Sequence, residues 1–167
     1  MNVSCMKITK LELVNIRCFE HIAIPFSRIS PSAVFIGKNG DGKSTILRSL
    51  AIGLCDQSSA SALFRELHGK FIREDSVKPS KVVVDLAAGS YNYRTETTFR
   101  RVKGFETFDQ AFFRWQGKSK PKKISHDEFP WERIVATGYG AGLRAQGTEG
   151  SVVSWALAKY LTKELMP

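Results

Sequence analysis

Apolar and polar residues alternate along several short stretches of the chain, and this alternation predicts β-strands buried on one face. The pattern occurs in four stretches, which are 9–13, 21–26, 82–86 and 91–101. The last two flank a short turn that contains Gly89-Ser90, so we expect them to form an antiparallel hairpin. Residues 15–19, between the first two, are too few for a helix and are predicted to be a turn.

A different pattern, a continuous apolar run, occupies residues 33–36. Such a run is typical of a strand that is buried on both faces in a parallel sheet covered by helices. Apolar residues then recur at helical spacing over 46–54, which predicts a helix just downstream. Further elements are expected as helices over 61–74, 104–115 and 151–166, and as a strand over 133–137.

The segment between the apolar run and the next helix matches the phosphate-binding pattern G-x-x-x-x-G-K-[ST]. Its glycines let the backbone curl tightly, so that successive N–H groups point at phosphate oxygens. We expect Lys43 to reach the β- and γ-phosphates and the Ser44 hydroxyl to ligate magnesium. The helix that begins at Lys43 adds its positive N-terminal end. The predicted nucleotide-binding residues of this loop are Gly37, Asn39, Gly40, Asp41, Gly42, Lys43, Ser44 and Thr45.

The predicted ligand is therefore a nucleoside triphosphate with Mg2+. ATP is favoured over GTP because no guanine-reading N-K-x-D motif occurs in the chain. Twenty-five Lys and Arg outnumber 16 Asp and Glu, which gives a net charge of +9 and favours polyanionic partners such as DNA or RNA. One breaker-rich loop is a candidate contact for phosphates, although it is equally well interpreted as a solvated loop. Its lysines are Lys118, Lys120, Lys122 and Lys123.

The remaining composition indicates where such a protein works. Three cysteines without metal-ligand spacing fit a reducing compartment. No apolar run approaches the ~20 residues that span a bilayer, and the first ten residues lack the apolar core of a signal peptide. We therefore expect a cytoplasmic protein with no membrane partner.

Several of these segments together resemble the P-loop ATPase heads of the RecF, SMC and ABC type. The loop's Asn-Gly followed by Gly-Lys-Ser is typical of them, and the opening strand with its turn is similar to their "N-F-R-x-F" start. The resemblance covers residues 6 to about 101 and, more loosely, 133–144. The matching stretches are Gly37–Thr45, Ile8–Phe19, Gly89–Arg94 with Arg100-Arg101, and Gly138–Ala141 with Arg144.

The resemblance implies an α/β fold of the P-loop NTPase class, with a mixed sheet of one parallel P-loop strand, an antiparallel hairpin and flanking helices. It also implies that a second ATPase head, as a homodimer or higher oligomer, closes over the γ-phosphate. In such heads an arginine at the position of Arg17 approaches the nucleotide. A glutamine at a strand exit ligates magnesium, and Gln146 is the best candidate, with Gln116 as the alternative.

Hydrolysis by such a head also needs a signature loop like LSxGQ and two acidic residues at the end of a later apolar strand. The chain contains no such signature. Asp85 ends the only apolar run that finishes in an acid, but Leu86 follows it and its strand is expected to be antiparallel. We therefore assign no catalytic residue in this chain and expect an incomplete ATP hydrolase, the N-terminal lobe of a head that needs a C-terminal lobe.

The lobe is predicted to consist of four consecutive parts. These are residues 1–56 with the P-loop and its helix, 57–101 with a helix and hairpin, a basic and aromatic insertion at 102–132, and a last strand, Gly-rich turn and helix at 133–167. The leading function is ATP-driven head dimerisation coupled to nucleic-acid processing or to an effector protein in anti-phage defence. Two alternatives stay open: a nucleotide-sensing assembly module without turnover, and a compact P-loop kinase or GTPase that uses Asp85.

Overall fold

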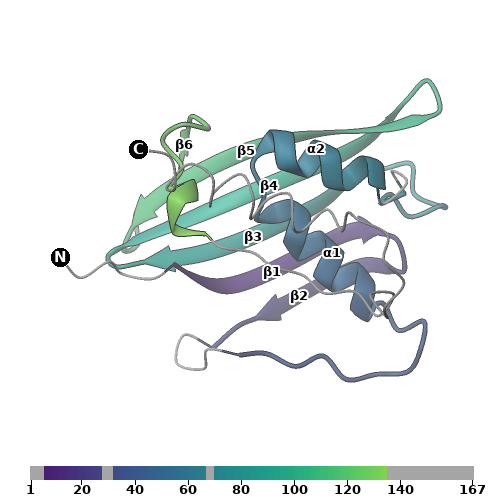
Figure 1. The fold of residues 1–167 in the computed structure, drawn as a ribbon, viewed down its shortest axis with the longest axis horizontal. Coiled ribbons are helices and arrows are strands. Elements are labelled where there is room, and N and C mark those ends of the chain that lie inside the picture. Colours follow the sequence, from purple (N-terminus) through teal and green to yellow (C-terminus); the bar gives the residue numbers. More distant parts are fainter. Residues whose placement is uncertain (1–5, 28–31, 67–69, 135–167) are drawn as a thin grey trace, which may run out of the picture.

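The computed structural model describes residues 6–27, 32–66 and 70–134. These residues form a six-stranded sheet with two helices on one face (Figure 1). The strands lie in the order β2-β1-β3-β4-β5-β6, and every neighbouring pair is antiparallel. The strands are β1 Lys7–Ile16, β2 Phe19–Pro25, β3 Ser80–Ala88, β4 Tyr91–Val102, β5 Phe105–Gln116 and β6 Lys122–Ile124. The helices are α1 Lys43–Gly53 and α2 Gln57–Glu66, and a short 3-10 helix covers Trp131–Arg133.

The predicted alternation of buried and exposed positions is confirmed in the first four strands. In β3, Val82 and Val84 are fully buried and point to the side of the helices. In β4 the same side carries two fully buried threonines and Phe99. The turn predicted at residues 15–19 is also present, because β1 ends at Ile16 and β2 begins at Phe19. The antiparallel half of the predicted fold therefore forms as expected.

The helix predicted over residues 104–115 is wrong, because this segment is strand β5. It pairs with β4 along its whole length, from Val102↔Phe105 to Tyr91↔Gln116. Its aromatic residues match both a helical and a strand spacing, and the long pairing with β4 decides between the two. Residues 105–124 therefore extend the main sheet by two strands.

Two other predicted boundaries need correction. The helix predicted over 61–74 is α2, which begins at Gln57 and ends at Glu66. Residues 71–73 are extended instead, and Ile72 forms an antiparallel bridge with Ile16. The first residue of the strand predicted over 133–137, Arg133, is the last residue of the 3-10 helix. Residues 135–137 lie outside the described residues, as do the predicted glycine-rich turn and terminal helix.

The parallel P-loop strand predicted over residues 33–36 is not formed within the described residues. The segment is irregular and runs outside the sheet, along the lower edge in Figure 1. Val34 is 81% exposed and Ile36 is 93% exposed, whereas Phe35 packs edge-on against Phe26. A strand buried on both faces needs neighbouring strands to pair with, and none of the described strands pairs with this segment.

The end of α1 is fixed to the sheet by a close approach and by hydrogen bonds. A Cβ on Gly53 would lie 2.5 Å from a methyl group of Val84, so only glycine fits there. Thr95 donates its hydroxyl to the Gly53 carbonyl at 2.6 Å, and the Gln110 amide reaches two further carbonyls nearby at 3.3 Å. These side chains satisfy carbonyls that a helix end leaves without partners, and they set the position of the helix that begins at the P-loop.

Candidate nucleotide-binding site

The P-loop runs from Gly37 into the first turn of α1, and its lysine folds back onto the loop itself. The Lys43 ammonium donates hydrogen bonds to the carbonyl oxygens of Gly37, at 2.6 Å, and of Lys38. The Asp41 carboxylate accepts the Lys38 N–H at 2.6 Å and closes the loop from the other side. The loop thus satisfies its own charges, and a phosphate has to compete with the two carbonyl oxygens for the Lys43 ammonium.

Gly42 is the residue at which the loop becomes a helix, and its conformation requires glycine. Its φ of 87° lies in the left-handed region, and its carbonyl accepts the Ile46 N–H at 2.9 Å as the first bond of α1. A Cβ at this position would lie 2.4 Å from the Phe19 ring and 2.7 Å from the Cys18 sulfur. The turn between β1 and β2 is therefore packed directly against the P-loop.

That turn is held in place by the extended segment at residues 71–73. The Arg17 N–H donates to the Phe71 carbonyl and the Arg73 N–H donates to the Asn15 carbonyl, both at 2.9 Å. On the other side, the Glu106 carboxylate accepts the N–H of Phe71 at 2.7 Å, and the following N–H as well. A single largely buried carboxylate from β5 thus fixes the extended segment that positions the Arg17 turn.

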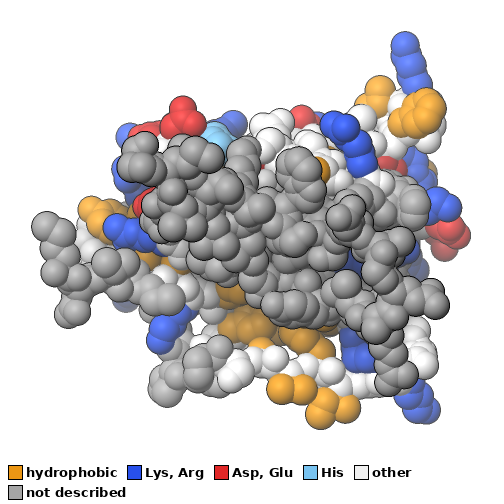
Figure 2. All heavy atoms as spheres, in the orientation of Figure 1, with side chains coloured by type: hydrophobic (Ala, Val, Ile, Leu, Met, Phe, Trp, Pro, Cys, Tyr) orange, Lys and Arg blue, Asp and Glu red, His pale blue; other side chains and the backbone are white. Residues whose placement is uncertain are grey.

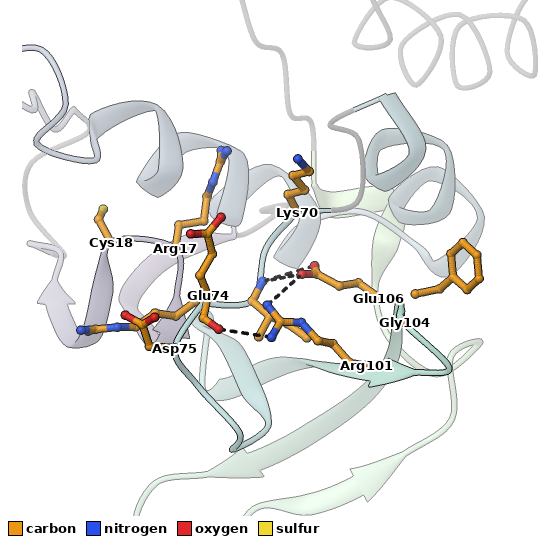
Figure 3. A pocket seen from close by; sticks show the side chains of 11 residues that line it. Arg17, Cys18, Lys70, Glu74, Asp75, Arg101, Gly104 and Glu106 are labelled. Atoms are coloured by element: carbon orange, nitrogen blue, oxygen red, sulfur yellow. Dashed lines mark hydrogen bonds and ion pairs between the residues drawn. The ribbon is translucent and has the colours of Figure 1, made fainter.

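An open cavity of about 760 Å3 lies between this turn, residues 70–75 and the β4–β5 turn. Four cationic side chains line it, and Figure 3 shows Arg17, Lys70 and Glu74 extending toward the same side. Cys18 belongs to both the cavity wall and the P-loop contact, so the cavity begins where the P-loop ends. The cationic residues are Arg17, Lys70, Arg73 and Arg101, and the acidic ones are Glu74, Asp75 and Glu106.

Comparison with known proteins decides the family. The family model described as the AAA ATPase domain matches residues 6–123, which is more than half of the chain. The chain belongs to the AAA ATPase domain family. This membership confirms the resemblance to P-loop ATPase heads, and the family's match includes both the P-loop and the six strands, apart from the last residue of β6.

This AAA ATPase domain is also similar to the OLD nuclease of Thermus scotoductus. The two are 32% identical over 97 residues, which cover 56% of this chain and 17% of the nuclease. The match therefore concerns less than a fifth of that relative's length. The activity of the complete relative does not transfer to this chain on this evidence.

The structure of the AAA ATPase domain places most of the other candidate residues away from the P-loop. Gln116 ends β5, and Gln146 lies outside the described residues. The four lysines of the basic loop are exposed in the connection after β5 and in β6, at the opposite end of the hairpin from the cavity (Figure 1). Within the loop, Ser44 is exposed and Thr45 is buried in the first turn of α1.

Asp85 is an ion-pair partner in the middle of the sheet. Arg94 from β4 donates to both of its carboxylate oxygens, at 2.6 and 3.1 Å. This hydrogen bond is the main cause that raises the pKa of the Arg94 guanidinium above its ordinary value. β3, the strand that carries Asp85, is antiparallel to both β1 and β4, as the sequence indicated. A carboxylate held by a bidentate arginine is a poor magnesium ligand, so we do not place the metal there.

Two negative findings concern only residues 6–27, 32–66 and 70–134. No helix in these ranges is long and apolar enough to cross a membrane. No cluster of three or more His, Cys, Asp and Glu side chains with metal-binding geometry occurs in them.

Burial raises the pKa of the Cys55 thiol to about 11, which keeps it protonated.

The clamp formed by Glu106 and residues 71–73 is the feature that the sequence did not indicate. Its partners are 34 and 35 residues apart, and no local pattern joins them. The sequence holds only a weak signal of it, because Glu106 is an acid beside apolar and aromatic residues. Only the pairing of β4 with β5 turns it toward the helices.

Proposed function

We propose that this AAA ATPase domain binds ATP with Mg2+ at the P-loop and uses it to bring two ATPase heads together. The observation that carries the proposal is the complete motif at the start of α1, packed against the Arg17 turn through Gly42. In the proposed complex the Lys43 ammonium leaves its two carbonyl partners for the β- and γ-phosphates, Ser44 ligates magnesium, and Arg17 adds a positive charge beside the phosphates.

We further propose that hydrolysis requires elements outside the described residues. The exposed apolar side chains of Val34 and Ile36 support this, because they are suited to a sheet that the described strands do not complete. In this proposal a C-terminal lobe supplies the neighbouring strands, the acidic residues and the closing signature loop, and Gln146 contributes to the metal site. The similar Thermus scotoductus protein is named a nuclease, which supports nucleic acid as the polymer on which the heads act.

Competition for a fluorescent ATP analogue tests the ligand. The chain is titrated with the analogue in Mg2+, and ATP or GTP is added as competitor. ATP is expected to displace the analogue at lower concentration than GTP. A clear preference for GTP would rule out the ATP assignment.

Measurement of phosphate release tests whether hydrolysis needs elements outside the described residues. The chain alone is expected to bind nucleotide but to release little phosphate, and Asp85→Ala is expected to leave that rate unchanged. Sustained Mg2+-dependent turnover that is lost in Asp85→Ala would overturn the incomplete-lobe proposal in favour of a compact P-loop enzyme. Asn92→Ala, which changes a partly exposed residue on the neighbouring strand β4, serves as the structural control.

A further inference from the structure

The β4–β5 hairpin projects past the helices at the upper right of Figure 1. Its last strand pair is Val102↔Phe105, joined by the two-residue turn Lys103-Gly104. Both turn residues have positive φ, 51° for the lysine and 85° for the glycine. Such turns favour asparagine or aspartate at the first position, and a lysine there is strained. The chain thus places a cation at the apex of the hairpin despite a conformational cost.

The same tip exposes an apolar pair. Phe105 is 77% exposed and Val102, directly opposite, is 50% exposed. By strand alternation both lie on the face opposite to the core-facing Phe99 and Phe108, so the described helices do not cover them. The Phe105 ring makes no ring stacking or cation–π contact with any described residue. A large aromatic surface is therefore left open to solvent at the tip.

The charges around this ring are mainly positive. Lys103 makes no ion pair with any described residue, whereas Arg101 donates to the Glu74 carbonyl at 3.3 Å and forms a long ion pair with Glu106 at 3.9 Å. The nearby acids already have partners: Glu106 accepts two backbone N–H groups, and Asp109 pairs with Arg100 at 2.5 Å. Figure 2 shows basic and apolar side chains together at this end of the molecule.

The cations continue from the tip into the cavity. Arg101, Gly104 and Phe105 line the same cavity as Lys70 and Arg17, so cationic side chains, with three acids among them, are spread from the apex toward the P-loop side (Figure 3). A flat membrane would meet only the apex of the hairpin. Arg101 lies on the face opposite to Phe105, so a flexible polyanion can bend around the apex from the ring to these cations. An open ring with cations close by is the arrangement that binds unpaired bases.

We propose that the 100–105 hairpin tip binds single-stranded nucleic acid. Phe105 stacks on a base, Val102 supports the ring from the opposite strand, and Lys103 and Arg101 neutralise the flanking phosphates. A duplex would hide its base faces from the ring, so the single strand is the favoured form. The proposal deepens the nucleic-acid coupling of the proposed function and gives it a surface.

The basic loop at 118–123 is the competing surface, at the opposite end of the hairpin and roughly 35 Å away along the strands. Two aromatic rings at that end already have cationic partners. Arg114 lies over the Tyr91 ring at 5.8 Å, and Arg94 lies over Trp115 at 5.6 Å. Phe113, opposite Lys123, is only partly exposed, so these lysines are suited to non-specific phosphate contact.

Fluorescence anisotropy with a labelled 20-mer of thymidine tests the tip, using the whole chain without nucleotide over a series of salt concentrations. Phe105→Ala is expected to weaken binding about ten-fold without changing the salt slope. Lys103→Gln is expected to lower the slope of log affinity against log salt by about 0.7, the value for one phosphate contact on a single strand. Phe105→Leu, which stays apolar but cannot stack, is expected to behave like Phe105→Ala.

Matched controls are Val77→Ala, which removes a fully exposed apolar side chain elsewhere, and Lys118→Gln, which removes a charge at the far end. Because Phe105 is mostly exposed, its variants are expected to keep the urea midpoint of the parent chain. The proposal is overturned if Phe105→Ala binds like Val77→Ala, or if Lys118→Gln lowers the salt slope and Lys103→Gln does not.

Vesicles of phosphatidylcholine and phosphatidylserine in a 7:3 ratio provide the other arm. Binding to them that depends on Phe105, with oligonucleotide binding that does not, would assign the tip to membranes and overturn the proposal. The P-loop is tested separately with ATP. A chain that binds the thymidine 20-mer through Phe105 but fails to bind ATP keeps this inference and loses the proposed function.

Discussion

Replacing Gly42 with alanine tests whether the β1–β2 turn is packed against the P-loop. The added Cβ would lie 2.4 Å from the Phe19 ring, about 1 Å closer than the 3.4 Å at which ordinary contact begins. Gly40 is the matched control, because its φ of 95° is equally left-handed but no atom lies within 4 Å of its Cβ position. The two variants therefore share the backbone cost and differ in the steric one.

The magnitudes follow from those two terms. An alanine in the left-handed region costs about 1–2 kcal/mol, which both variants should show. Forcing the turn aside to admit the extra methyl costs about 1–3 kcal/mol more, which only Gly42→Ala should show. We therefore expect a difference of about 1–3 kcal/mol between the two free energies of unfolding.

Urea denaturation followed by circular dichroism measures both free energies. A background that carries Phe19→Leu and Cys18→Ala removes the two nearest groups, and there the difference should fall below about 1 kcal/mol. Equal unfolding free energies for the two alanine variants in the parent background would refute the packing of the turn on the loop. A difference that persists undiminished in the trimmed background would refute the named contacts.

Three other predictions concern stability and reactivity. Thr95→Val removes the hydroxyl that caps α1 and should lower the free energy of unfolding by about 1–3 kcal/mol. Thr97→Val should lower it less, because the Thr97 hydroxyl makes only a 3.4 Å hydrogen bond. Equal urea midpoints for the two variants would contradict this prediction. Exposed Cys18 should react with iodoacetamide at pH 8 at least about ten-fold faster than Cys55, whose pKa is raised to about 11. ATP with Mg2+ should protect Cys18 from this reaction. Peptide mass spectrometry measures the modification of both cysteines. A hydrogen bond from a lysine is the main cause that lowers the pKa of Glu12 from its ordinary 4.5. Ionised Glu12 therefore stabilises the fold above that ordinary pKa, and this stabilisation is lost as the pH falls through the lower pKa of the folded state. Glu12→Gln should lower the free energy of unfolding by less than about 1 kcal/mol at pH 7 and not at all near pH 2, as measured by denaturant titration.

The sequence predicted elements whose pattern is local. The alternation in β3 and β4 leaves one face apolar, so the pairing of these strands follows from a single hairpin. The P-loop follows from a motif whose chemistry depends on spacing alone. These are the parts in which neighbouring residues determine the structure.

The elements that were missed depend on partners distant in sequence. Phe105, Phe108 and Phe112 are spaced as on a helix, and only the pairing with β4 makes them a strand. The run at 33–36 is apolar like a central strand, but none of the described strands pairs with it. The Glu106 clamp joins β5 to residues 71–73, and no local rule predicts such a contact.

The central claim is that Lys43 is the phosphate-binding lysine of a working nucleotide site, and calorimetric titration with ATP and Mg2+ tests it most directly. Lys38→Ala is the control, because this exposed lysine lies in the same loop and contributes only its backbone to the Lys43 contact. Lys43→Ala is expected to lower the affinity for ATP by about 10- to 150-fold. This loss corresponds to about 1.5–3 kcal/mol, the contribution of one hydrogen bond to a charged group. The affinity of Lys38→Ala is expected to stay within about three-fold of the parent. Equal affinities for the two variants, or no ATP binding by the parent chain, would contradict the account.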